Sequence, residues 1–215
     1  MLAQPIVSVY CEDVPKLSDR LRDERRRHIE VSAWKCFSRN GFHATSMDDI
    51  IAETGMSSSA VYRYFRSKDD LIAAAADEAL TLVRDTFAHL SEQDPPPSPK
   101  EVLNALVASL DRQTTTHDYD LSRITIQAWG EALRRPELRE RSVHFYAEVR
   151  AHLTTLAKRW QSNGRRLPKA RAEAAASALF ALMPGLIIGH HLSEPLAAEQ
   201  LLAGIDAIAD VTRSG

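Results

Sequence analysis

The sequence predicts an all-α protein of about nine helices, in which a small N-terminal three-helix domain precedes a C-terminal helical bundle. Three observations support this fold class. Apolar residues recur at the three- and four-residue spacing of amphipathic helices, no segment alternates like a strand, and the 215 residues include only eight glycines. Apolar residues make up 44% of the chain and charged residues 26%, proportions typical of a soluble globular protein.

The first 17 residues have little periodicity and no clear helix cap, so we expect a mobile arm over residues 1–17. A long helix is expected from Ser18 or Asp19 to Asn40, and Gly41 should end it. Its inward stripe comprises Ile29, Ala33, Cys36 and Phe37.

Two short helices separated by a tight turn are predicted next. Thr45 and Ser46 can cap the first, and Gly55 can end it because glycine adopts positive φ without strain. Ser57 can cap the second, with Val61 and Phe65 pointing inward. Its outer face then carries Ser58, Ser59, Tyr62 and Arg63. Two short helices with a glycine turn and a polar outer face describe a helix-turn-helix.

Six further helices are expected in the rest of the chain. Ser67 caps the first, which ends near Ser91, before the proline-rich segment 94–99. The others are expected over about Lys100–Thr116, Leu121–Arg134, Glu137–Asn163, Pro168–Ser193 and Pro195–Arg213. Pro136 and Gly164 separate three of them.

Positive charge is concentrated on the helix-turn-helix. Residues 16–68 hold eleven Lys and Arg against seven Asp and Glu, whereas the whole chain has a net charge of −2. The first long helix carries Arg20, Arg22, Arg25, Arg26 and Arg27. These arginines form either a solvated face or a surface that meets phosphates.

Over about residues 29–72 the chain resembles the TetR family of transcriptional regulators. The matching positions are Ala33, Phe37, Gly41, Phe42, Thr45, Ile50, Gly55, Ser57, Tyr62, Phe65, Lys68 and Leu71. Ser59 and Ile51 depart from the family pattern. These departures affect which DNA bases the protein would read, and not the predicted fold. Beyond this window the resemblance is architectural.

The resemblance implies a homodimeric, ligand-responsive transcriptional regulator, most often a repressor, that binds a palindromic operator in double-stranded DNA. A small apolar or aromatic effector would release it. The chain would then divide into an arm over 1–17, a helix-turn-helix DNA-binding domain over 18–66, and a ligand-binding and dimerisation domain over 67–215. The helix that begins after Ser67 would join the DNA-reading head to the body as a lever.

The expected DNA-binding residues are Thr45, Ser46, Ser57, Ser58, Ser59, Tyr62, Arg63, Tyr64 and Lys68. Arg63 can make the bidentate contact to guanine, and the hydroxyls of Ser58 and Ser59 can meet base edges. Tyrosine, threonine and lysine side chains would hold the phosphate backbone. A serine-capped helix without this role has the same small residues at its start.

Large side chains of the body suggest an effector pocket between its helices, lined by Trp129, Phe145, Tyr146, Trp160, Phe180 and Met183. Such side chains also form ordinary core. Pro184 interrupts a helical segment, removing one backbone hydrogen bond where a cavity can open.

Small and branched side chains on the last two helices predict a dimer interface comprising Ala178, Gly185, Gly189, Leu201, Ile205 and Ile208. Small residues let another helix approach closely, and the resemblance implies a four-helix interface across a two-fold axis. The alternative is that this surface packs on the chain's own bundle.

No residue pattern indicates a cofactor, a metal site or an enzyme. His190 and His191 are adjacent and do not share a helix face, and no glycine-rich phosphate loop or glycine-flanked serine is present. No membrane span or secretory signal is expected, which favours the cytoplasm. Two other functions stay open: a helical small-molecule binding protein or enzyme with an unused head, and a DNA-bending protein.

Overall fold

The computed structural model describes residues 19–115, 118–162, 165–194 and 197–213, and over these residues it confirms the predicted all-α class. The expected arm over 1–17 lies outside the described residues. The head consists of α1 (Asp19–Ala44), α2 (Met47–Thr54) and α3 (Ser58–Tyr62). The body consists of α4 (Lys68–Glu92), α5 (Pro99–Thr115), α6 (Leu121–Ala132), α7 (Pro136–Ala157), α8 (Lys169–Leu192) and α9 (Ala198–Arg213).

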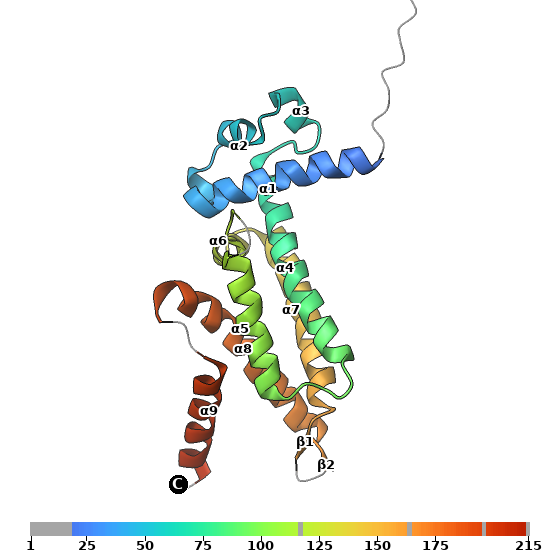
Figure 1. Ribbon diagram of the computed structural model, residues 1–215, viewed down its shortest axis with the longest axis vertical. Helices are drawn as coiled ribbons and strands as arrows, with labels where there is room; N and C mark the ends of the chain where they lie inside the picture. Colours follow the sequence, from blue (N-terminus) through green and yellow to red (C-terminus); the bar gives the residue numbers. More distant parts are fainter. Residues whose placement is uncertain (1–18, 116–117, 163–164, 195–196, 214–215) are drawn as a thin grey trace, which may run out of the picture.

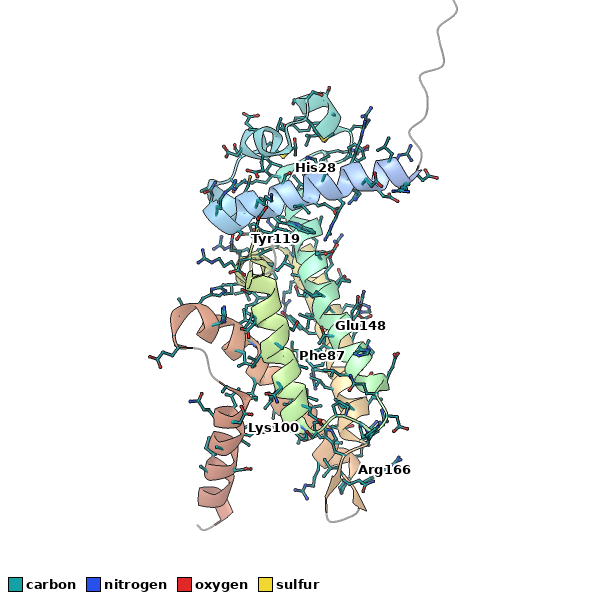
Figure 2. All side chains as sticks on the ribbon, in the orientation of Figure 1. His28, Phe87, Lys100, Tyr119, Glu148 and Arg166 are labelled. Atoms are coloured by element: carbon teal, nitrogen blue, oxygen red, sulfur yellow. The ribbon has the colours of Figure 1, made fainter. Side chains whose placement is uncertain are left out.

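Helix α1 lies across one end of the upright body helices, and α2 and α3 lie on its far side (Figure 1). Leu71, Ile72 and Ala75 at the start of α4 belong to the core of the head, so α4 runs from the head into the body. A second core, around Phe87 and Leu153, holds α4, α5, α7 and α8 together. Figure 2 shows Phe87 within the body and Tyr119 at the junction with α1.

Serine caps begin three of the helices, as predicted. Ser46 caps α2 with a full capping box, in which its hydroxyl accepts from Asp49 N and the Asp49 carboxylate accepts from Ser46 N. Ser57 and Ser67 cap α3 and α4 by accepting from the backbone N–H three residues on. Gly55 ends α2 with φ 64°, in the left-handed region.

Gly41 breaks α1 where the sequence predicted that it ends. Its backbone has φ 83° and ψ 165°, although α1 continues beyond this residue to Ala44. This conformation is open almost only to glycine. A Cβ at this position would also lie 3.3 Å from Oε1 of Gln127, a residue of α6.

Replacing Gly41 with alanine should lower the free energy of unfolding by about 1–3 kcal/mol, the usual cost of such backbone strain. Gly130 provides a matched control, because it lies inside α6 and its added Cβ would meet nothing within 4 Å. Gly130→Ala should stabilise the protein by about 0.5–1 kcal/mol. Urea denaturation measures both changes, and equal effects of the two substitutions would contradict the strain at Gly41.

The predicted end of the seventh helix is wrong. Helix α7 ends at Ala157 rather than near Asn163, and a short antiparallel hairpin follows, formed by β1 (Gln161–Ser162) and β2 (Arg165–Arg166). The indole N–H of Trp160 donates to Pro97 O at 2.7 Å, which ties this hairpin to the proline-rich segment. Trp160 is therefore a structural residue at the far end of the body.

Helix α8 differs from expectation in one respect. Its 24 residues are long and apolar enough to cross a membrane on length and composition alone, despite Glu173, Pro184 and His190, and 22% of its most apolar window is buried. A single helix of this kind is weak evidence for a membrane, because a core helix of a soluble protein can have the same length and composition. Its exposed apolar surface instead bears on the dimer considered below.

Candidate nucleic-acid interface

The outer face of α3 is exposed, as a base-reading surface requires. Val61 is fully buried and Phe65 is 2% exposed, so these two side chains fix α3 on the core of the head. Tyr62 on the opposite side is 44% exposed. Ser58, Ser59 and Arg63 are also exposed, whereas Tyr64 is half-buried. The polar side chains predicted for this face therefore lie together on one surface.

Arg63 follows the last residue of α3 and is free to reach a ligand. Its guanidinium lies 5.8 Å from the centre of the Tyr64 ring, and it has no carboxylate partner among the residues that the structure describes. Arg66 is likewise exposed and has no ion pair within the described ranges. Both arginines keep their full hydrogen-bonding capacity for base edges or phosphates.

Most arginines of α1 are engaged within the protein. Arg20 pairs with Glu24 at 2.8 Å, and Arg22 lies 3.8 Å from Asp19. Arg26 pairs with Glu30 at 3.1 Å and covers the Phe65 ring, while Arg27 pairs with Glu78 of α4 at 2.9 Å. The surface predicted to meet phosphates is thus largely a set of internal ion pairs.

Arg25 is the exception on α1. It lines an open groove with Ser57 and Ala60 at the start of α3, and it has no ion pair among the described residues. The sequence offered Arg25 only as one of five arginines. Leu21 and His28, one turn away on α1, line the same groove, but its other wall comes from the start of α3, which no pattern local to Arg25 reveals.

Thr45 was predicted to contact phosphate and to help cap α2, and both expectations are wrong. The residue is only 1% exposed. Its hydroxyl donates to Gly41 O at 2.8 Å, with Cys36 O at 3.3 Å. Because the side chain closes the broken end of α1, it cannot reach DNA without dismantling that contact.

Ser46 and Lys68 are partly committed to the fold. The Ser46 hydroxyl donates to Asp49 Oδ2 at 2.7 Å, and the hydrogen bonds from its hydroxyl and its backbone N–H lower the pKa of Asp49. Lys68 Nζ donates to Thr45 O at 2.9 Å, which joins the start of α4 to the turn before α2. An ammonium has three N–H bonds, so Lys68 retains donors for a phosphate.

The aromatic residues predicted to line a pocket form a packed cluster instead. The Trp129 indole N–H donates to the Tyr146 hydroxyl, and the Tyr146 ring meets Phe180 edge-on at 5.4 Å and Phe145 at 5.1 Å. Burial raises the pKa of Tyr146, so the hydroxyl stays neutral. These rings contact one another, and Trp129 also lines a cavity of about 20 Å³ with Leu80 and Leu138.

Met183 does line a cavity, between α4, α5 and α8. The cavity volume is about 40 Å³. Its other walls are Val83, Thr86, Leu106, Ser109, Leu110, Leu186 and Ile187. Small-molecule sites usually measure about 300–1,000 Å³, so an effector can enter here only if α8 moves away from α4 and α5.

The surface predicted as a dimer interface is exposed in the single chain. Ala178 and Gly185 are exposed, Gly189 and Leu201 are half-buried, and Ile205 is 42% exposed. Ile208, the sixth predicted residue, is 69% exposed, and Ile188 and Leu192 extend this apolar surface with exposures of 40% and 81%. Helix α9 packs on α5, where Lys100 Nζ lies 3.1 Å from Glu199.

Family comparisons match most of the chain. The family described as bacterial regulatory proteins of the tetR family matches residues 30–75, which contain the helix-turn-helix. The family described as the C-terminal domain of BetI-type transcriptional repressors matches residues 99–212, more than half of the chain. Helix α8 lies within the second match.

Individual relatives agree with these families. The transcriptional regulator BetI of Escherichia coli is 24% identical over 189 residues, covering 86% of this chain and 92% of BetI. The uncharacterized regulator YfiR of Bacillus subtilis is 33% identical over 81 residues, so the match spans only 40% of that relative and 36% of this chain.

A solved structure shares the fold along nearly its whole length. It is a putative transcriptional regulator from Saccharomonospora viridis in complex with choline, 23% identical, with a TM-score of 0.60. The alignment covers 87% of this chain and 96% of that chain. The exposed α3 face, the helical body and both family matches lead to one conclusion: the chain belongs to the TetR family of bacterial transcriptional regulators, which are not enzymes.

Proposed function

We propose that this protein is a homodimeric repressor that holds a palindromic operator through its two α3 helices and leaves it when a small molecule enters the body. The observation that carries this proposal is the outer face of α3. Tyr62 and Arg63 are exposed, Val61 and Phe65 behind them are buried, and Arg63 has no acidic partner among the described residues.

Base recognition falls to the side chains of α3 that face outward. Arg63 donates in bidentate fashion to guanine, and Ser58 and Ser59 meet neighbouring base edges in the major groove. Ser57 begins the same surface, and Tyr62 and Tyr64 offer hydroxyls to phosphates. The hydroxyl of Ser46 shares its hydrogen bonds with Asp49, so this residue serves DNA mainly by ordering the start of α2.

Three cations next to α3 supply the phosphate contacts that set its position. Lys68 and Arg66 flank the start of α4, and Arg25 lies across the groove from Ser57. Together they surround α3 with positive charge, which attracts nucleic acid of any sequence. The base contacts of α3 then distinguish the operator from other DNA. Arg25 and Arg66 thus join the residues that the sequence indicated.

Two copies would pair through α8 and α9. The exposed small residues Ala178 and Gly185 allow close helix approach, and Ile205 and Ile208 add apolar area. A two-fold axis makes both α3 helices equivalent, so the operator should be palindromic with half-sites about 34–36 Å apart. Pairing would also bury the apolar surface of α8, which would explain why this helix is apolar in a cytoplasmic protein.

The effector is proposed to be a small apolar or aromatic molecule, or a quaternary ammonium. Choline is bound by the Saccharomonospora viridis relative. In this chain the rings of Trp129, Tyr146 and Phe180 contact one another in the closed body. An opening that separates them would expose ring faces, which attract quaternary ammonium groups. An effector that binds only an opened body would favour a head spacing that no longer fits the operator.

Selection of bound fragments from genomic DNA by the purified protein tests the proposal. We expect recovery of a few fragments that share one palindrome, at a salt concentration where unrelated DNA is not retained. Recovery of fragments without a shared sequence would favour a DNA-bending protein. Recovery of no fragment at any salt concentration would favour a binding protein with an unused head.

A further inference from the structure

Helix α6 belongs to the body in sequence order but packs into the core of the head. Ile124 is fully buried and Leu121 is 3% exposed, both within the cluster that contains Phe37 and Phe42 of α1. Tyr119, just before α6, meets the Trp34 ring edge-on at 5.3 Å. The head therefore rests on α6 as well as on α4.

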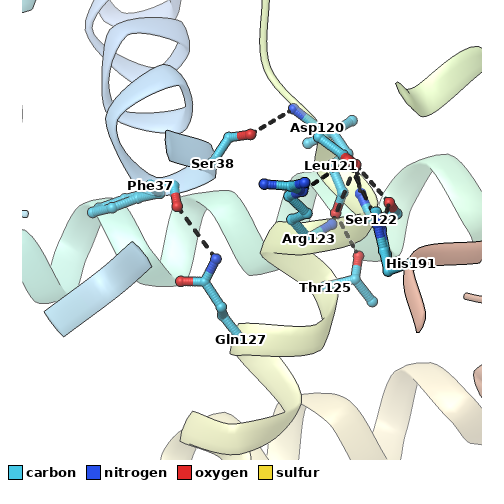
Figure 3. Close-up of polar contacts among 9 residues, drawn as sticks. All are labelled: Phe37, Ser38, Asp120, Leu121, Ser122, Arg123, Thr125, Gln127 and His191. Carbon is cyan, nitrogen blue, oxygen red and sulfur yellow. Dashed lines mark hydrogen bonds and ion pairs between the residues drawn. The ribbon is translucent and has the colours of Figure 1, made fainter. Parts of the chain in front are cut away.

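The break at Gly41 interrupts the regular backbone geometry of α1. Phe37 O lies at the end of the regular helix, and Phe42 N follows the residue with positive φ. Gln127 of α6 serves both groups. Its Oε1 accepts from Phe42 N at 2.7 Å, and its Nε2 donates to Phe37 O at 3.2 Å, the contact drawn in Figure 3.

We propose that Gln127 is a positioning residue through which α6 sets the orientation of the DNA-reading head. The inference rests on the proposed operator-binding function. A side-chain amide with both its donor and its acceptor engaged permits one orientation, because rotating α1 relative to α6 breaks at least one of the two hydrogen bonds. The two bonds lie on either side of the Gly41 break, so losing either one releases α6 from one side of that break.

A second contact connects the same junction to α8. The Asp120 backbone N–H, at the start of α6, donates to the Ser38 hydroxyl of α1 at 2.9 Å. The Asp120 carboxylate accepts from the Ser122 hydroxyl at 2.5 Å, and that hydroxyl lies 2.6 Å from His191 Nε2. The Ser122 hydroxyl thus bridges the Asp120 carboxylate and the His191 ring (Figure 3).

These contacts form one continuous route from the body to the head. His191 lies at the end of α8, whose middle carries Met183 on the wall of the small cavity. A displacement of α8 reaches α6 through Ser122 and Asp120. Gln127, further along α6, then passes the displacement to both sides of the Gly41 break. Helix α4 is thus one of two connections between the body and the head.

The test measures how operator affinity depends on half-site spacing, in full-length dimers of the wild type, Gln127→Met and Gln127→Glu. Fluorescence anisotropy is recorded on the selected operator and on versions with one base pair inserted or deleted at the centre. Gln93→Met is the matched control, because Gln93 lies beyond the far end of α4 and its side chain has no hydrogen bond among the described residues. Thermal unfolding of each variant reports any loss of folded protein.

The wild type and Gln93→Met should lose affinity steeply when the spacing changes. In Gln127→Met this spacing penalty should become roughly threefold to tenfold smaller, the factor that one or two neutral hydrogen bonds represent. Gln127→Glu can still accept from Phe42 N but cannot donate to Phe37 O, so it should behave like Gln127→Met. A merely structural role would lower affinity for all spacings by the same factor.

An unchanged spacing penalty in both Gln127 variants would overturn the inference while leaving the proposed function intact. An operator that wild-type protein binds equally well at all three spacings would overturn it too, because the heads would then have no fixed orientation to set. Failure of the wild type to select any operator would instead count against the proposed function.

Discussion

Replacing Arg63 with alanine should weaken operator binding by about 2–6 kcal/mol, the largest effect that we expect from any single substitution. A bidentate arginine–guanine contact discriminates by about 1–3 kcal/mol, and a dimer makes the contact twice. The free guanidinium of Arg63 loses no internal ion pair among the described residues when it is removed. The free energy of unfolding should therefore stay within about 0.5 kcal/mol of the wild type.

Fluorescence anisotropy at one fixed salt concentration measures this loss, and Arg84→Ala provides the control. Arg84 is a half-buried arginine on α4 whose guanidinium pairs with the neighbouring Asp85 at 3.4 Å, away from the head. Its removal takes away the same charge without touching α3. Equal losses for Arg63→Ala and Arg84→Ala would show that net charge, rather than base contact, determines affinity.

Replacing Gly185 with glutamate should convert the dimer to monomers and lower operator affinity by roughly 10²–10⁴-fold, because the second head then binds without the first. An added Cβ at Gly185 meets nothing within 4 Å in the single chain. The monomer should consequently keep its helical content. A charged side chain in a close helix contact is both bulky and costly to desolvate.

Sedimentation velocity measures the oligomeric state, and Val143→Glu serves as the control. Val143 on α7 is 60% exposed and lies outside the proposed interface, so this variant should remain dimeric. A Gly185→Glu protein that sediments as a dimer would place the association surface elsewhere. Circular dichroism of both variants excludes unfolding as the cause.

The elements that the sequence predicted correctly depend on local chemistry. Ser46, Ser57 and Ser67 accept hydrogen bonds within the next turn, and Gly41 and Gly55 adopt positive φ. Such contacts form between residues a few positions apart, so a single sequence contains the information for them. The starts of α2, α3 and α4, the end of α2 and the break in α1 followed from these signals.

Most of the incorrect predictions concern contacts between distant segments. Thr45 is an exception, because its hydroxyl donates to Gly41 O only four residues back, and its resemblance to a helix cap concealed this contact. The hairpin after α7 is too short to show alternation, and Trp160 is fixed by the distant Pro97. Gln127 and Arg25 gave no local signal, because their partners lie 85 residues away on α1 or across the groove beside α3.

Chemical footprinting of the selected operator tests the central claim most directly. The account predicts protection of guanine N7 atoms in two successive major grooves on one face of the duplex, related by a two-fold axis and about 10 base pairs apart. Arg63→Ala should remove protection at one guanine in each half-site while phosphate contacts remain. Protection confined to the minor groove, or to a single half-site, would contradict a dimer that places one α3 in each of two major grooves.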